Sequence, residues 1–206
     1  MASLQPAEES ALPISPRSRQ LGDRQLAVKK RLLEAGLELV CEIGYVDLTL
    51  RAVATRAGAT HTTAYNYFAS KAHLVAELFY SVLLTVPTET PDPSVPLSER
   101  IAAALGAVAL KFGEVEALAR AGHAALYQEE PDVVLVRGAI GADLVRRIVI
   151  SSGDEADAEL TELAMITYIG ALEWAGAGAL GYDEVGARIE RVARYFEFAK
   201  TAGITG

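Results

Sequence analysis

A short segment in the N-terminal third is rich in side chains that donate and accept hydrogen bonds. Residues 60–68 read THTTAYNYF, and few of these residue types are good helix formers. A helix of this composition is a poor structural choice unless its exposed face meets a partner with many donors and acceptors. The phosphates and base edges of DNA are such a partner. The segment therefore predicts a contact with nucleic acid.

The neighbouring residues have the spacing of a helix-turn-helix. Thr49 can cap a short helix over residues 50–57, which Gly58 then ends. Thr60 can cap a second short helix over residues 61–68. In a motif of this kind the second helix enters the major groove of DNA.

Two further helices are expected on either side of this motif. Apolar residues at three- and four-residue spacings predict an amphipathic helix over residues 24–43, ended by Gly44. Ser70 can cap a helix over residues 71–84. Cys41, the only cysteine, excludes an internal disulfide and is expected to be a buried, unreactive thiol.

The run from Thr49 to Phe79, with the preceding helix, resembles the DNA-binding domain of the tetracycline-repressor (TetR) family over about residues 24–84. The landmarks are Gly44-Tyr45, Thr49, Ala57-Gly58, Thr60, Tyr65, Tyr67-Phe68 and Ser70-Lys71. The residues that depart from the family pattern are Thr62, Ala64 and His73. These departures bear on the operator sequence and leave the expected fold unchanged.

The resemblance implies which side chains touch DNA. Phosphate contacts are implied for Thr49, Thr60, Tyr67 and Lys71, and base-edge contacts for some of His61, Thr62, Thr63 and Asn66. Tyr65 can either pack inward or reach a phosphate, and Phe68 is expected in the core. Further candidates for phosphate or minor-groove contacts are Arg17, Arg19, Arg24, Lys29 and Lys30.

The charge is unevenly distributed along the chain, which has a net charge of −8. Residues 1–75 contain nine Lys or Arg and seven Asp or Glu. Residues 76–206 contain ten Lys or Arg and twenty Asp or Glu. A basic end joined to an acidic body is typical of a protein that touches a polyanion with one end. Charge alone also allows chance clustering on solvated faces.

The rest of the chain predicts more helices and no strands, so the expected fold class is all-α. The segment TVPTETPDPSVP separates two parts of the chain. The expected helices beyond it cover residues 97–112, 114–128, 131–151, 155–180 and 183–202. The expected organisation is a disordered arm (1–20), a helix-turn-helix DNA-binding domain with three helices (21–70), and a helical domain for effector binding and dimerisation (71–206).

The C-terminal part offers a dimer interface and a ligand pocket. One face of the last helix presents Val185, Ile189, Val192 and Phe196, and the resemblance implies a homodimer in which two helices of each subunit meet. Packing of this face within one chain is the alternative. Candidate residues for a pocket are Phe112, His123, Tyr127, Met165, Tyr168 and Trp174, for each of which ordinary core packing is the alternative.

The remaining motifs exclude other classes of protein. The chain has no G-x-S-x-G motif, no P-loop and no G-x-G-x-x-G that opens a strand-to-helix unit, so we expect no enzyme and no cofactor. No His or Cys pair has metal-ligand spacing, no apolar run is long enough to span a membrane, and no secretory signal is recognised, so we expect a cytoplasmic protein. The sequence predicts a repressor that a small apolar effector releases from a pseudo-palindromic operator. The alternatives are an architectural DNA-binding protein without an effector and a helical carrier.

Overall fold

The computed structural model describes residues 22–203, so the expected arm over residues 1–20 lies outside the described residues. The described part is all-α, as expected, and contains no strand. The helices are α1 (Asp23–Asp47), α2 (Leu50–Arg56), α3 (His61–Tyr67), α4 (Lys71–Leu84), α5 (Leu97–Gly113), α6 (Glu116–Leu126), α7 (Pro131–Ser152), α8 (Ala158–Gly176) and α9 (Val185–Thr201). Two short 3₁₀ turns, η2 (Gly153–Glu155) and η3 (Tyr182–Glu184), precede α8 and α9.

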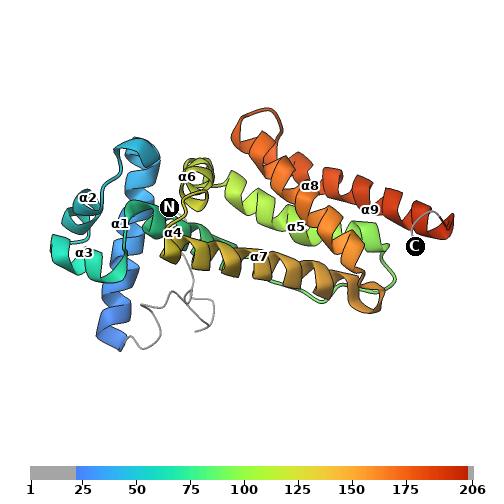
Figure 1. Ribbon diagram of the computed structural model, residues 1–206, viewed down its shortest axis with the longest axis horizontal. Coiled ribbons are helices and arrows are strands. Elements are labelled where there is room, and N and C mark those ends of the chain that lie inside the picture. Colours follow the sequence, from blue (N-terminus) through green and yellow to red (C-terminus); the bar gives the residue numbers. More distant parts are fainter. Residues whose placement is uncertain (1–21, 204–206) are drawn as a thin grey trace.

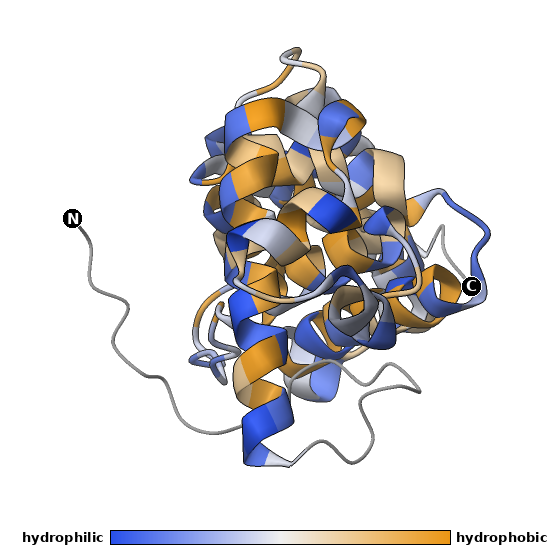
Figure 2. Ribbon diagram, turned by 90° about the vertical axis from the view of Figure 1, so that its left-hand side faces the viewer, coloured by the Kyte–Doolittle hydropathy of each residue, from blue (hydrophilic) through white to orange (hydrophobic). Residues whose placement is uncertain are grey.

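The helices form two groups that α4 connects (Figure 1). Helices α1, α2 and α3 lie at one end, and α5, α7, α8 and α9 run lengthwise through the other part of the molecule. Helix α4 packs against α1, α6 and α7, while α5 packs against α7 and α9. Figure 2 shows hydrophobic and hydrophilic stretches alternating along the helices, as amphipathic helices require.

Local capping chemistry sets the start of the short helices. The hydroxyl oxygens of Thr49, Thr60 and Ser70 each accept a hydrogen bond from a backbone N–H three residues later. These three predicted caps are confirmed. The helix predicted over residues 155–180 is shorter at both ends, because Asp157 caps α8 and the chain turns at Gly178, which has φ +76°.

The end of α1 differs in two ways from the expectation. Gly44 has φ +73°, so the regular helix breaks there, but a further turn reaches Asp47. Cys41 is exposed, and the prediction of a buried thiol is wrong. Because Leu39 and Val40 face the core, the next residue along the helix turns toward solvent.

The apolar face of α9 is part of the core of the single chain. Val185, Ile189 and Phe196 are at most 6% exposed, and α9 packs along α5 and α8. The close approach uses two glycines, since a Cβ on Gly106 would lie 3.3 Å from the Cα of Gly186. The prediction that this face forms the dimer interface is therefore wrong. The face packs within the single chain, which was the alternative. Val192, on the same helix, is partly buried.

Candidate functional site

Helix α3 is held by its apolar side and presents its polar side to solvent. Ala64 and Phe68 are fully buried. Helix α3 packs on α2, and the Phe68 ring meets the ring of His73 on α4 edge-on. The predicted DNA-contacting residues that are exposed are Thr49, Thr60, His61, Thr62, Tyr65 and Asn66. Those that are partly buried are Thr63, Tyr67 and Lys71. The prediction that Phe68 belongs to the core is confirmed.

Contacts within α3 order its exposed side chains. The ring of His61 meets the ring of Tyr65 edge-on, with 4.6 Å between centroids. The hydroxyls of Thr60 and Thr63 are hydrogen-bonded at 2.8 Å. Tyr65 is 45% exposed. Its side chain therefore points outward and is not packed in the core, the other position that the sequence allowed.

Lys71 has a structural role that the sequence analysis missed. Its Nζ donates hydrogen bonds to the carbonyl oxygens of Tyr45, at 3.0 Å, and Val46, at 2.9 Å. The same ammonium lies 4.7 Å from the centroid of the Tyr45 ring. Lys71 therefore satisfies carbonyls at the end of α1 and ties this end to the start of α4.

A buried polar cluster joins α1 to α4 next to the turn that follows α3. Nζ of Lys29 lies 3.0 Å from Oε2 of Glu77, and Nε2 of His73 lies 3.4 Å from Oε1 of Glu77. Nδ1 of His73 accepts a hydrogen bond from the backbone N–H of Ala69. The prediction that Lys29 contacts DNA is wrong, because its side chain is buried in this cluster.

The far end of α4 is tied to α7 by a buried arginine. The guanidinium of Arg147 donates to the carbonyl oxygens of Leu83, Val86 and Pro87, at 2.8 to 3.2 Å. Its Nε donates to Asp143 at 2.7 Å, which balances the buried charge. Helix α4 is thus anchored at both ends, by α1 at its start and by α7 at its end.

A cavity of about 380 Å³ lies between these anchors, surrounded by α4, α5, α6, α7 and α8. Its lining includes the predicted pocket residues Phe112, His123, Tyr127, Met165 and Tyr168. Trp174 is not among the lining residues and is 66% exposed, so its assignment to the pocket is wrong. On α8, residue 173 faces the cavity, and the next residue is rotated by about 100° to the outside.

Helix α4 also contributes to this cavity, which the sequence did not predict. Phe79 and Leu83 of α4 line it, and the Phe79 ring stacks on that of Phe112 with 4.0 Å between centroids. Phe79 also packs so closely on α6 that a Cβ on Gly122 would lie 2.3 Å from its ring. The apolar spacing of residues 71–84 was the available signal, but it does not distinguish core from cavity wall.

The rim of the cavity carries a hydrogen-bonded polar group. Nδ1 of His123 lies 3.0 Å from one carboxylate oxygen of Glu173, and the Tyr127 hydroxyl donates to the other oxygen at 3.0 Å. The hydrogen bond to this carboxylate raises the pKa of the Tyr127 hydroxyl above its usual value. These contacts connect α6 to α8 across the cavity.

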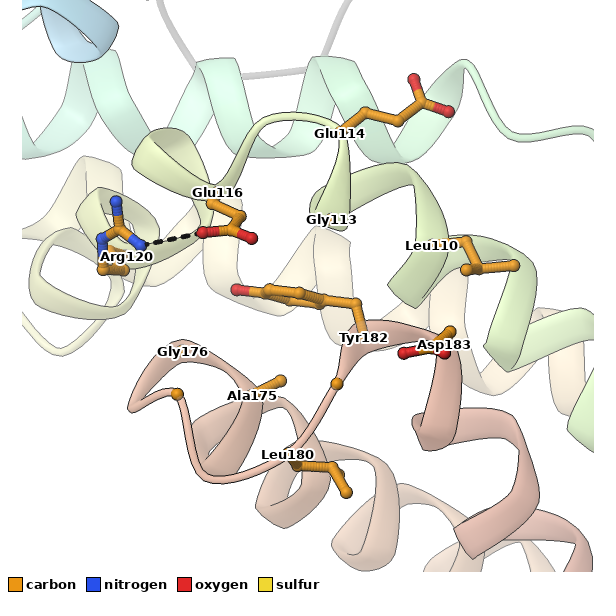
Figure 3. Close-up of a pocket in the computed structure, with 12 residues that line it drawn as sticks. Leu110, Gly113, Glu114, Glu116, Arg120, Ala175, Gly176, Leu180, Tyr182 and Asp183 are labelled. Carbon is orange, nitrogen blue, oxygen red and sulfur yellow. Dashed lines mark hydrogen bonds and ion pairs between the residues drawn. The ribbon is translucent and has the colours of Figure 1, made fainter.

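A second hollow is more open and lies between the α5–α6 turn and the loop before α9 (Figure 3). The ring of Tyr182 covers Gly113 there and points toward the ion pair of Glu116 with Arg120, whose charged atoms are 3.2 Å apart. This hollow is a surface cleft whose lining also contains Glu114 and Asp183. It shares no lining residue with the cavity beside α4.

The comparisons with known proteins agree with this arrangement. Residues 32–78 match the family described as bacterial regulatory proteins, tetR family. The chain is 37% identical over 168 residues to an uncharacterized HTH-type transcriptional regulator of Mycobacterium tuberculosis, covering 81% of this chain and 78% of that protein. This chain belongs to the TetR family. It is a TetR-family transcriptional regulator.

Solved structures of other proteins have the same fold as this TetR-family chain. A TetR transcriptional regulator from Rhodococcus sp. RHA1 superimposes with a TM-score of 0.67 at 20% identity, over 83% of this chain and 95% of that one. The complex of SmeT with triclosan superimposes with a TM-score of 0.51 at 15% identity, over 82% of this chain and 91% of SmeT. Within residues 22–203 of the TetR-family chain, no helix has the length and apolar character needed to cross a bilayer.

Proposed function

We propose that this TetR-family regulator is a repressor that binds a pseudo-palindromic operator as a homodimer and leaves it when a small, largely apolar ligand enters the cavity beside α4. One observation carries the proposal. Phe79 and Leu83, which line the cavity, belong to the helix that follows directly after the DNA-facing helix α3. SmeT, whose fold is similar, was solved as a complex with triclosan.

The proposed DNA contacts are the polar side chains on and around α3. Base-edge contacts come from the exposed His61, Thr62 and Asn66 and from Thr63, which is partly buried. Phosphate contacts come from Thr49, Thr60, Tyr65, Tyr67 and Lys71. Lys71 keeps its hydrogen bonds to the carbonyls at the end of α1. In this proposal its ammonium therefore meets a phosphate without moving from this position.

The proposed dimer interface is the outer face of α8 and α9, opposite the buried stripe. Large apolar side chains are exposed on both helices, which is the composition of an interface core. They are Leu163, Ile166 and Trp174 on α8 and Tyr195 and Phe198 on α9. A two-helix face of this kind can pair with its own copy around a twofold axis, which places two α3 helices for two half-sites.

The proposed switch uses α4 as the element between ligand and DNA. A ligand releases DNA only if it binds the released conformation more tightly than the DNA-bound one. Filling the space between Phe79, Phe112 and Leu144 presses on α4 between its two anchors. A small displacement of α4 changes the separation of the α3 helices from the roughly 34 to 36 Å that successive major grooves require.

The test selects DNA from a random duplex library with the purified full chain and sequences what is retained. We expect a pseudo-palindrome whose half-sites are about one helical turn apart. A thermal-shift screen of small apolar compounds then supplies ligands, and each ligand is added to the protein bound to the selected duplex. Release of DNA at the concentrations that stabilise the protein supports the proposal. Sequence-specific binding that no stabilising ligand alters would favour the architectural alternative.

A further inference from the structure

The cavity beside α4 has an apolar interior and one carboxylate at its rim. Its walls include Phe79, Val108, Phe112, Ile140, Leu144 and Met165. Among the lining residues of the described chain, Glu173 is the sole acidic one, and its side chain is 41% exposed. A carboxylate at the mouth of an apolar space must keep hydrogen-bond partners or water to remain ionised.

The partners of Glu173 are a hydroxyl and an imidazole. The Tyr127 hydroxyl donates to one oxygen, and Nδ1 of His123 lies 3.0 Å from the other. A hydroxyl satisfies a hydrogen bond of Glu173 without balancing its charge, and an imidazole balances that charge only when both ring nitrogens carry a proton. Within the described residues, no lysine or arginine pairs with this carboxylate.

The other charged lining residue is already balanced elsewhere. Arg137 donates to the carbonyl oxygen of Leu126 at 2.7 Å, and its guanidinium lies 3.5 Å from the carboxylate of Glu129. Glu129 is not among the lining residues. An anionic ligand would thus meet the carboxylate of Glu173 and an arginine that is already paired. A cation would meet a carboxylate that has no lysine or arginine partner, beside aromatic rings.

We propose that the effector of this cavity is a lipophilic amine in its cationic form, an inference that rests on the proposed function. Its apolar body lies against the stacked rings of Phe79 and Phe112, and its ammonium N–H donates to Glu173. The ammonium replaces Tyr127 or His123 on the carboxylate. Because those two side chains hold α6 to α8, their displacement loosens α6, which also packs on α1 and α4.

The experiment compares three ligands that share one ring system: 1-naphthylmethylamine, 1-naphthalenemethanol and 1-naphthoate. Calorimetric titration of the full chain at pH 7.5 measures each affinity. We expect the amine to bind about tenfold more tightly than the alcohol, the effect of one charge-assisted hydrogen bond, and the naphthoate to bind most weakly. The same order should hold for the concentrations that release the selected DNA.

Two variants make the comparison specific. Glu173→Gln should bind the amine and the alcohol equally. Its affinity for the alcohol should stay within about twofold of the parent, and this result would show that the cavity is intact. Glu162→Gln, an exposed position on the same helix, should keep the full preference for the amine.

Three results would overturn the inference. They are equal binding of amine and alcohol by the parent, tightest binding of the naphthoate, and no binding of any of the three. If the alcohol binds and releases DNA while the amine has no advantage, the proposed ligand-responsive function stands and the charge preference fails. If the amine binds with the expected preference but leaves DNA bound, the ligand class stands and the proposed repressor mechanism fails.

Discussion

Lys29 and Glu77 form an ion pair that is buried between α1 and α4, with 3.0 Å between the ammonium and a carboxylate oxygen. The side chains are 2% and 0% exposed. A charge in this position is stable only while its partner is present. The pair therefore fixes how α1, and with it the α2–α3 unit, sits on α4.

Removing one partner of this pair should destabilise the fold far more than removing both. We expect Lys29→Met to lower the free energy of unfolding by about 3 kcal/mol, since it leaves the Glu77 carboxylate buried and unmatched. The double variant Lys29→Met, Glu77→Leu should recover most of the loss. Urea denaturation followed by circular dichroism measures both. Lys30→Met, which removes an exposed ion pair with Glu34, is the control and should cost less than about 1 kcal/mol. Equal stability of Lys29→Met and the parent would contradict this account.

Specific and nonspecific DNA affinity should respond to different residues of α3. Asn66→Ala removes an exposed amide that can read a base edge, so it should change the preference at one base pair by about 1 to 3 kcal/mol. Tyr67→Phe should instead weaken all duplexes about equally, because a phosphate contact carries no sequence information. Fluorescence anisotropy with the selected duplex and its single-base variants measures both effects. A uniform loss for Asn66→Ala would place this side chain on the DNA backbone instead.

The outer face of α8 and α9 should carry the dimer. Phe198 is 69% exposed in the single chain, so Phe198→Glu should leave the helices folded but yield monomers in light scattering. Phe196→Glu is the matched comparison on the same helix. Phe196 is 6% exposed, and a charge there should prevent folding of the chain itself. Folded dimers of Phe198→Glu would locate the interface on another surface.

A methyl group added between α4 and α6 should lower the stability of the fold. Gly122→Ala places a Cβ 2.3 Å from a ring carbon of Phe79, so the ring must move into the cavity. We expect a loss of about 1 to 3 kcal/mol in stability and weaker ligand binding. Gly138→Ala on α7 is the control, because no atom lies within 4 Å of its added Cβ. It should leave ligand binding unchanged and raise stability by up to about 1 kcal/mol. Unaltered ligand affinity in Gly122→Ala would show that Phe79 has room to move elsewhere.

Local sequence was sufficient for the features that depend on a few neighbouring residues. The caps Thr49, Thr60 and Ser70 act on backbone groups three residues away, so their positions predict where α2, α3 and α4 begin. The all-α class and the polar surface of α3 follow from periodicity and side-chain type within single helices. For the same reason the helix-turn-helix could be identified before any tertiary contact was known.

The tertiary structure decided which side of each amphipathic helix faces the core and which faces a partner. The stripe of Val185, Ile189 and Phe196 is equally suited to packing on α5 or on a second subunit, and only the position of α5 settles the choice. Lys29 is read from the sequence as a basic surface residue, yet its partner Glu77 lies 48 residues further along the chain. Burial depends on contacts between residues this far apart in the chain, and the residue types near Lys29 do not predict such contacts.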